Sequence, residues 1–483
     1  MGKYLKSVVK DTLKYGIGSV LQRFIGFFLM PIYTRIFTPA DYGIMNIIFT
    51  VSSLLGTLLT FGMAGSFFRY YHEYDEDDKV VLASTIQIFR LFASFLICSV
   101  LALFSKQISG GVLGDGKYYD LILLSLATII LSTMWDLTVD ILRVQFRVIW
   151  YNYIQVGGLL LQTVLSILFV VFLKYGLFGL FFAQLISNIV ICSSSLWITR
   201  KSYSLKFNIS ILKNQLTFGI GFLPSLFTNW VTSSSDRIFL SRFAKLSDVG
   251  IYSISNQIAT PVRLLTSSFR TAWVPTAYRD LNKDESPRNF SQTGLYYATL
   301  ISFVVLGCSL FSSDIVHILT PESYHRSYLY VPIITYGMLF EGLNLMFAEG
   351  LNFANKPYYR SLSFVIGAIL NFSLNFYFIP KFQILGASIT TLLAYLTTFL
   401  LGYYWAVKFY PRIKYDIRKV FLIVLYCVPF IVIGFLIDRE YALINILYKF
   451  GIYILVVCSL ILIFFRVDAK NVIRRYRKSS KEV

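Results

Sequence analysis

Long apolar runs separated by short polar links extend along the whole chain. Each run has roughly 18 residues or more, enough for a helix to cross the ~30 Å hydrocarbon core of a bilayer. The runs fall at 13–37, 42–71, 80–105, 118–146, 151–173, 177–199, 216–243, 249–278, 290–311, 328–353, 358–379, 384–407, 420–437 and 442–465. Backbone groups in lipid must be satisfied within their own segment. We therefore predict an all-α integral membrane protein with about 14 transmembrane helices.

An internal repeat organises these runs. The stretch 34–44 (TRIFTPADYGI) returns 207 residues later as 241–251 (SRFAKLSDVGI), and the same offset aligns two further positions. The matched pairs are Arg35 with Arg242, Asp41 with Asp248, Gly43 with Gly250, Ile44 with Ile251, Lys174 with Lys381 and Gly179 with Gly386. A fixed offset of this kind indicates duplication. We predict two pseudo-symmetric six-helix lobes, followed by two C-terminal helices that have no counterpart.

The polar links set the expected boundaries of the lobes. They divide the chain into an N-terminal lobe (1–200), a cytoplasmic linker (201–213), a C-terminal lobe (214–407), a basic linker (408–419), two extra transmembrane helices (420–466) and a basic cytoplasmic tail (467–483). Six is an even number, so both lobes insert with the same orientation. Repeats of this kind are related by an axis along the membrane normal, and transporters place their substrate between them.

Composition supports the membrane class, and the charge distribution orients the chain. The chain is 56% hydrophobic and 14% charged, with a net charge of +19. When residues near the end of a run are counted with the adjoining link, 29 of the 44 Lys and Arg residues fall on the side of the N-terminus, 10 on the other side and 5 deeper within the runs. This asymmetry is the positive-inside pattern, which predicts that both termini are cytoplasmic. Contact with anionic membrane lipids explains the basic charge better than nucleic acid does, so we expect no nucleic-acid partner.

Candidate substrate-binding residues are the polar groups within the apolar runs. In run 249–278 the spacings of 4, 3, 4 and 3 place Asn256, Thr260, Arg263, Ser267 and Arg270 on one helical face. Arg23 and Arg237 lie within two other runs. A charge at mid-bilayer costs roughly 2.5–3.5 kcal/mol, so such residues usually face a cavity or a partner. Snorkelling of Arg270 to the headgroups, and structural pairing of the others, are the alternatives.

Four acidic residues within the runs are candidates for coupling-ion binding. They are Asp136, Asp140, Glu341 and Glu349. A proton or sodium ion would couple transport to an ion gradient. For Asp136 and Asp140 the alternative is a ladder of ion pairs with Arg143 and Arg147, one and two turns further on. The sequence shows no Walker A, HExxH or GxSxG motif and no Cys/His cluster, so we expect no enzyme activity, no cofactor and no metal.

The N-terminal pattern resembles a known family. A first run containing glycine is followed by TRIFTPADYGIMNI and then by a second run that reaches Phe61-Gly62 and Arg69-Tyr70. This pattern is similar to the polysaccharide-biosynthesis, O-antigen-type flippases of the multidrug/oligosaccharidyl-lipid/polysaccharide exporter superfamily. The stretch from Ser235-Asp236-Arg237 to Val249-Gly250-Ile251-Tyr252 fits as well.

The resemblance implies a function. It implies two lobes that open alternately to each side of the bacterial cytoplasmic membrane. The implied substrate is an undecaprenyl-pyrophosphate-linked oligosaccharide, moved to the outer leaflet for assembly of O-antigen, capsule or exopolysaccharide. Arginines within the runs agree with this substrate, because a guanidinium holds a phosphate bidentately.

Three alternatives stay open at this point. A flippase for lipid II or another lipid-linked precursor would share the architecture and the cationic residues. A multidrug or cation antiporter of the same superfamily would favour acids in its cleft instead. A membrane scaffold without transport would favour large loops outside the membrane, and the links here are short. A polysaccharide polymerase is a further expected partner.

Overall fold

Every regular element that the structure describes is a helix. The computed structural model describes residues 25–281, 283–436 and 442–464. Within these ranges there is no strand, which confirms the predicted all-α class. In the described part of the chain, ten helices are long and apolar enough to cross a membrane. One of them, α18 (Pro357–Phe409), covers two predicted runs and has a non-helical residue, Gln383, between them (φ 49°, ψ −120°). The number 14 stays a prediction.

The two most polar of the predicted runs do not qualify as spans by composition. They form α10 (Ile209–Ile220) with α11 (Leu223–Phe243), and α12 (Leu246–Ile258) with α13 (Thr260–Asp280). Run 13–37 is described only from residue 25, as the short apolar helix Ile25–Ile36. These two runs hold Arg237, Arg263 and Arg270, and their polar side chains lower the hydropathy of the runs.

The helices gather into two compact units. Unit 1 comprises residues 1–253 and 372–387, and unit 2 comprises 254–371 and 388–483. Residues 201–253 join unit 1 because α11 packs against α2 (Pro39–Leu59), and α10 packs against α3 (Met63–Tyr70). The lobe boundaries expected from the sequence, 1–200 and 214–407, stay predictions about the ancestral repeat.

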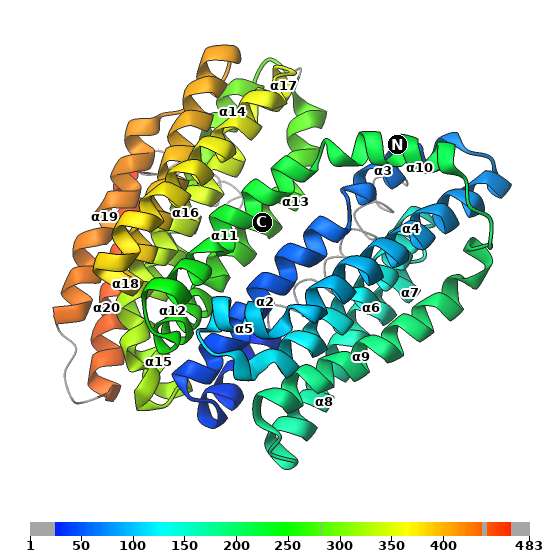
Figure 1. Cartoon of the computed structure of the whole chain (residues 1–483). Helices are drawn as coiled ribbons and strands as arrows, with labels where there is room; N and C mark the ends of the chain where they lie inside the picture. The colour runs from blue at the N-terminus through cyan, green and yellow to red at the C-terminus, as the bar shows by residue number, and fades with distance from the viewer. Residues whose placement is uncertain (1–24, 282, 437–441, 465–483) are drawn as a thin grey trace, which may run out of the picture. The chain divides into compact units, whose positions relative to one another are not determined.

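Unit 1 is built around α6 (Tyr119–Val144). On either side of it lie α4 (Glu76–Leu103) and α9 (Gly176–Thr199), and the three run side by side (Figure 1). The remaining elements of this unit are η1 (Tyr71–Glu73), α5 (Ser105–Leu113), η2 (Gly116–Tyr118), α7 (Val148–Asn152), η3 (Tyr153–Gly157), α8 (Gly158–Ile167), η4 (Leu168–Phe172) and η5 (Arg200–Ser202). Met63, Phe67, Leu82, Ile86, Leu137 and Ile141 form a buried core between α3, α4 and α6.

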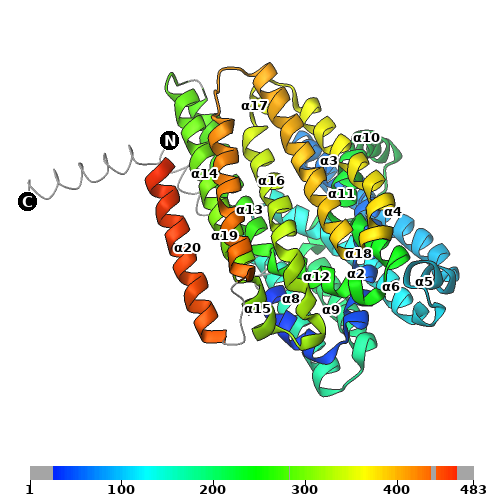
Figure 2. The ribbon, with the colours of Figure 1, turned by 90° about the vertical axis from the view of Figure 1, so that its left-hand side faces the viewer.

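Unit 2 is built around α14 (Ser286–Leu310). It contacts α13, α16 (Val331–Phe347), α19 (Ile417–Leu436) and α20 (Ala442–Phe464), and α14, α19 and α20 lie next to one another in Figure 2. The short elements are α15 (Ser312–Leu319), η6 (Glu322–Tyr330) and α17 (Gly350–Phe353). A buried ion pair anchors α20, because Lys449 Nζ lies 2.7 Å from both Asp314 Oδ2 and Ser313 Oγ. The two C-terminal helices are thus an integral part of this unit.

The repeat is visible in the way two helices begin. Asp41 and Asp248 are each the third residue of their helix, α2 and α12. Each carboxylate accepts a hydrogen bond from the backbone N–H three residues earlier, at 3.1 Å in both copies. This interaction satisfies one of the free N–H groups at a helix start. The equivalent roles of the two aspartates support the duplication.

The matched glycines of the repeat pack against the opposite copy. A Cβ atom on Gly43 would lie 2.0 Å from the Leu246 carbonyl oxygen, and one on Gly250 would lie 2.0 Å from the Pro39 carbonyl oxygen. These reciprocal contacts leave no room for any side chain. The two repeated stretches are therefore in backbone contact within unit 1, which gives Gly43 and Gly250 a physical role that the sequence offset alone did not show.

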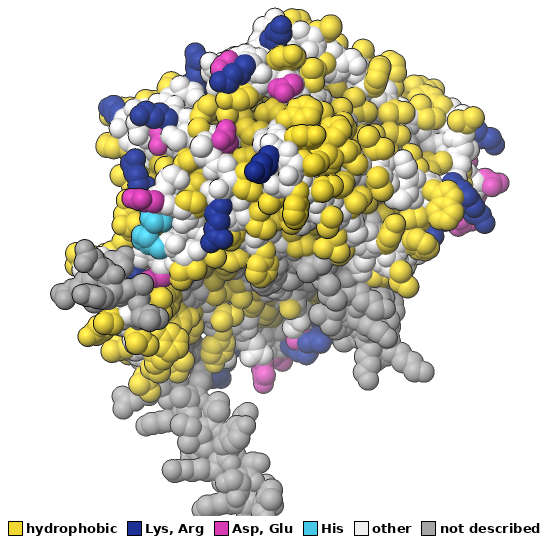
Figure 3. Space-filling model, turned by 90° about the horizontal axis from the view of Figure 1, so that it is seen from below, with side chains coloured by type: hydrophobic (Ala, Val, Ile, Leu, Met, Phe, Trp, Pro, Cys, Tyr) yellow, Lys and Arg dark blue, Asp and Glu magenta, His cyan; other side chains and the backbone are white. Residues whose placement is uncertain are grey.

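Apolar side chains dominate the exposed surface. Hydrophobic residues cover much of the described surface in Figure 3, and charged residues form small separate groups. Leu103, Ile149 and Leu436 are each about four-fifths exposed. Soluble proteins rarely expose contiguous apolar patches of this extent. This surface suits contact with lipid.

Candidate functional site

Four residues of the predicted polar stripe, Thr260, Arg263, Ser267 and Arg270, lie on α13, in unit 2. Asn256 lies on α12, so the chain breaks at Ala259 and the five residues do not share one continuous helix as predicted. Helix α13 begins at Thr260, and Pro261 stands in its first turn, where a missing N–H costs nothing. Its buried face carries Val262, Thr266, Trp273 and Ala277. Arg263 and Ser267 are half-buried and Arg270 is exposed. The stripe therefore lies beside the face that packs into the unit, and its guanidinium groups remain accessible.

Arg263 faces an acid that the sequence analysis assigned to a different role. Its Nε lies 3.6 Å from Oε2 of Glu341 on α16, and the two side chains are 38% and 27% exposed. This separation is an ion pair but exceeds the usual length of a hydrogen bond. The structure thus joins one predicted substrate-binding residue to one predicted coupling residue. The two side chains are partly accessible, although the facing atoms, Arg263 Nε and Glu341 Oε2, are themselves buried.

Glu349 lies in a very different environment at the end of α16. Its Oε2 accepts a hydrogen bond from Arg360 Nη1 at 2.7 Å, and its Oε1 accepts one from Asn352 Nδ2 at 2.9 Å. The side chains of Arg360 and Glu349 are only 13% and 4% exposed. Both carboxylate oxygens are satisfied and desolvated, so the geometry favours a structural pair that joins α16 to the start of α18.

The other two acids lie in unit 1, and each is close to an arginine. Asp136 Oδ2 is 3.8 Å from Arg90 Nη2, and Asp140 Oδ1 is 3.7 Å from Arg143 Nη1. The pair of Asp140 and Arg143 is one step of the ladder of ion pairs along a single helix, which is the alternative to a coupling role for these acids. Arg90 comes from α4, is 2% exposed and was not predicted to meet Asp136. Gln87, one turn away on α4, is also buried, and its side-chain atoms have no hydrogen-bond partner within the described residues.

Arg237 and Asn256 occupy α11 and α12. Arg237 donates from Nη1 to the carbonyl oxygen of Ser233 at 3.4 Å, and it belongs to unit 1. The neighbouring Asp236 is buried and accepts a hydrogen bond from the Tyr252 hydroxyl. Asn256 is half-buried, and its carbonyl oxygen accepts a hydrogen bond from Thr260 Oγ1 at 3.4 Å. Arg23 lies outside the described residues.

The sequence analysis identified the four candidate acids but missed the arginines that pair with two of them. Arg90 and Arg360 are the cations that face Asp136 and Glu349, and both partners come from another helix. Arg360 follows Glu349 by only 11 residues across a short break, and this proximity was an available signal. In the described part of the chain, no group of three or more His, Cys, Asp or Glu side chains could hold a metal ion.

The fold defines a class of multi-pass membrane protein. The structure matches the lipid II flippase MurJ in an inward closed conformation with a TM-score of 0.75, over 94% of this chain and 98% of that one, at 16% sequence identity. At this identity the likeness shows the fold alone.

The family follows from the sequence comparisons. Residues 8–279 match the model of the polysaccharide biosynthesis protein family, and the chain belongs to this family, as its sequence pattern predicted. Residues 224–377 also match the MatE model.

Curated relatives are distant in sequence. The succinoglycan biosynthesis transport protein ExoT of Rhizobium meliloti is 23% identical over 59% of this chain, and the match spans only 56% of that protein's length. The probable low-salt glycan biosynthesis flippase Agl15 of Haloferax volcanii is 22% identical over 80% of this chain and 81% of its own length.

Proposed function

We propose that this protein is a flippase for lipid-linked oligosaccharides. Its substrate would be an undecaprenyl-pyrophosphate-linked unit, moved by alternating access across the bacterial cytoplasmic membrane for surface polysaccharide assembly. The observation that carries the proposal is the accessible arginine stripe of α13 in a member of the polysaccharide biosynthesis family. The names of the succinoglycan transport and glycan flippase relatives support it.

The pyrophosphate would bind where Glu341 now partly neutralises Arg263. Guanidinium groups bind phosphate bidentately and more strongly than a lone ammonium does. Arg270 lies two turns further along α13, on the same face, and would hold the second phosphate or the first sugar. Arg23, Arg237 and Asn256 complete the proposed binding set along the substrate path. Each contact to a charged group is worth about 1.5–3 kcal/mol.

Coupling to a proton or sodium gradient is the second part of the proposal. Asp136, Asp140 and Glu341 are the better candidates, because each lies 3.6–3.8 Å from its arginine and can gain a proton or cation without breaking a short hydrogen bond. Glu349 is the weakest of the four, since both of its oxygens are already hydrogen-bonded. Flipping that is insensitive to both gradients would contradict this part alone.

Two other functions of the same fold are the nearest competitors. A lipid II flippase would also present a pyrophosphate, so only the glycan distinguishes it. A multidrug or cation antiporter is favoured by the MatE match over residues 224–377. The arginines count against the antiporter, because the half-buried Arg263 and the exposed Arg270 would repel a cationic drug. A polysaccharide polymerase remains a proposed partner of the flippase.

The decisive experiment is complementation of a strain that lacks its own flippase. The wild-type chain should restore surface polysaccharide, and Arg263→Ala and Arg23→Ala should each impair the display while the protein is still inserted at normal levels. Arg326→Ala, an exposed arginine on η6, is the matched control and should behave as the wild type. Full display by Arg23→Ala and Arg263→Ala, singly and together, would overturn the cationic mechanism.

The orientation has its own test. The charge asymmetry places both termini in the cytoplasm and predicts opposite sides for the links that contain Gly114 and Lys206. Reporter fusions at these two positions should therefore give opposite signals. The same signal from both would show that the proposed topology is wrong, whatever the substrate.

A further inference from the structure

The link between α9 and α10, in unit 1, exposes its apolar side chains. Leu205 is 99% exposed, more than any other large hydrophobic residue in the described part of the chain, and Ile209 is 69% exposed. Phe207 lies between them and is also exposed. These three residues, called the apolar row below, alternate along the chain with Lys206 and Asn208. Contact of three large apolar side chains with water is unfavourable, so the apolar row needs a partner.

Hydrogen bonds to α4 hold the backbone of this link in place (Figure 1). The backbone N–H of Ser204 donates to Ser84 Oγ at 2.7 Å, and that of Asn208 donates to Thr85 Oγ1 at 3.1 Å. The side chain of Asn208 also caps the start of α10, where it accepts hydrogen bonds from two backbone N–H groups. The link is therefore tied to the protein on both sides of Leu205, and the apolar row cannot turn inward without breaking these ties.

The ties also fix the position of the link along α4. This helix is long and apolar enough to cross a membrane, and it begins with three exposed acids, Glu76, Asp77 and Asp78. Ser84 follows Asp78 by six residues, which is about 9 Å along a helix. The charged start of α4 belongs in water, so the apolar row lies up to about 9 Å closer to the hydrocarbon core. This depth agrees with the roughly 5–10 Å over which interfacial segments bury their apolar side chains.

The charged residues of the link and of the first two turns of α10 are all positive. They are Arg200, Lys201, Lys206 and Lys213, and all four are exposed. Residues 141–235 contain no Asp or Glu. The Arg200 guanidinium lies 5.2 Å from the ring of the exposed Trp197, at the end of α9, and an exposed Trp is typical of a membrane–water interface. Each Lys or Arg near an anionic lipid surface strengthens binding roughly fivefold.

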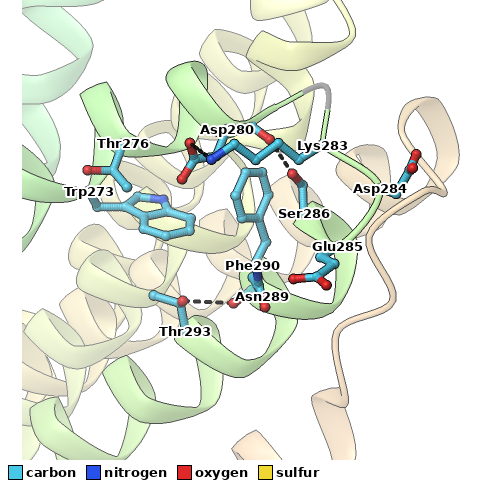
Figure 4. A pocket seen from close by; sticks show the side chains of 10 residues that line it. All are labelled: Trp273, Thr276, Asp280, Lys283, Asp284, Glu285, Ser286, Asn289, Phe290 and Thr293. Carbon is cyan, nitrogen blue, oxygen red and sulfur yellow. Dashed lines mark hydrogen bonds and ion pairs between the residues drawn. The ribbon is translucent and has the colours of Figure 1, made fainter.

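The link between α13 and α14 has the opposite character. It follows eight predicted runs and the α9–α10 link follows six, so the sequence places both links on the same side of the membrane. Figure 4 shows Asp280, Lys283, Asp284 and Glu285 at the α13–α14 link. An anionic surface would repel this excess of carboxylates, so the α13–α14 link belongs in water and provides an internal comparison.

We propose that residues 197–213 form an interfacial anchor, which lies on the membrane surface and binds anionic lipid headgroups. The apolar row inserts at the boundary between headgroups and acyl chains, and the four basic side chains contact headgroup phosphates. The anchor keeps the start of α10 at the membrane surface. Its partner is the lipid surface, so the anchor is independent of the substrate that the protein moves.

The test uses the purified full chain in nanodiscs of phosphatidylcholine, with and without phosphatidylglycerol. A nitroxide label is attached to one cysteine at a time, placed by Leu205→Cys, Lys206→Cys or Glu285→Cys in a Cys458→Ser background, since the other four native cysteines are buried. EPR saturation measures how often each label meets oxygen, which concentrates in the bilayer, and a nickel chelate, which stays in water. The label at position 205 should favour oxygen, and the labels at 206 and 285 should favour nickel.

Removal of charge tests the choice of lipid. Omitting phosphatidylglycerol, or combining Lys201→Gln with Lys213→Gln, should lower the oxygen preference of the label at position 205 and leave the label at 285 unchanged. An oxygen preference at 205 that survives both changes would contradict the anionic partner. A label at 205 that meets the nickel chelate as often as the label at 285 would place the apolar row in water, and one shielded from both reagents would show that protein covers it. Either of these results would overturn the anchor and leave the proposed flippase function standing.

Discussion

Two arginine–glutamate pairs of unit 2 show how differently the same chemistry can be used. Arg360 and Glu349 meet at 2.7 Å with almost no exposure, and the second carboxylate oxygen is held by Asn352. Arg263 and Glu341 stand 3.6 Å apart and are about one-third exposed. Both glutamates belong to one stretch of chain, eight residues apart. Burial and the number of partners, more than the residue types, separate a structural pair from one that can exchange ligands.

The difference has an energetic basis. Two charges taken out of water lose several kcal/mol of hydration each and regain it only in a short, fully hydrogen-bonded geometry. Glu349 has that geometry, so its loss would leave Arg360 buried and uncompensated. An exposed pair typically contributes about 0–1 kcal/mol, and its members are free to separate. Arg263 can therefore bind an incoming anion at little cost to the fold.

The largest expected effect is on stability, from Glu349→Ala. It should lower the free energy of unfolding by about 3–5 kcal/mol, because the guanidinium of Arg360 stays buried without its carboxylate. Unfolding of the purified protein by heat or denaturant would measure this. Glu341→Ala, eight residues earlier on α16, is the matched control and should cost about 1 kcal/mol or less. Equal losses from the two variants would break the distinction between the pairs.

A second buried pair extends the comparison to the C-terminal helices. Lys449→Met should destabilise unit 2 by an amount within the same range of about 3–5 kcal/mol, because the carboxylate of Asp314 would stay largely buried without its partner. Unfolding of the purified variant by heat or denaturant measures the loss. A wild-type stability for Lys449→Met would show that α20 is held by apolar packing alone.

Substitutions in the pair of Arg263 and Glu341 should change ligand binding. Arg263→Ala should weaken the binding of farnesyl pyrophosphate, a soluble probe for the lipid pyrophosphate, by about 1.5–3 kcal/mol, and Arg263→Lys should recover part of this loss. The partial recovery is expected because an ammonium keeps the charge but loses the bidentate geometry. Calorimetry on the purified chain would show it, with Arg326→Ala as the control. Full recovery by lysine would indicate that only the charge matters.

The smallest effect is expected from substitution of Glu341, whose carboxylate would compete with the ligand for Arg263. Glu341→Gln should strengthen the binding of the same probe, by no more than about fivefold, since an exposed pair contributes at most about 1 kcal/mol. Glu322→Gln, an exposed glutamate on η6, provides the control. Weaker binding in Glu341→Gln would mean that Glu341 orients Arg263 for the ligand and does not compete with it.

The sequence by itself was sufficient for the class, the family and the repeat. Apolar runs long enough to span a bilayer must form helices, because a helix satisfies the backbone hydrogen bonds within its own segment, and this follows from local composition. The 207-residue offset identified Asp41 and Asp248 as equivalent, and both cap a helix in the same way. The spacing along α13 placed Arg263, Ser267 and Arg270 on one face, because a single helix has a fixed period.

Only the tertiary structure decided which charges meet. Arg90 faces Asp136 from another helix, Arg360 faces Glu349 across a helix break, and Arg263 faces Glu341 across two packed helices. Periodicity within one helix cannot specify how a second helix is rotated or shifted against it. The four acids looked alike in the sequence, yet one is buried with both oxygens satisfied and another is open.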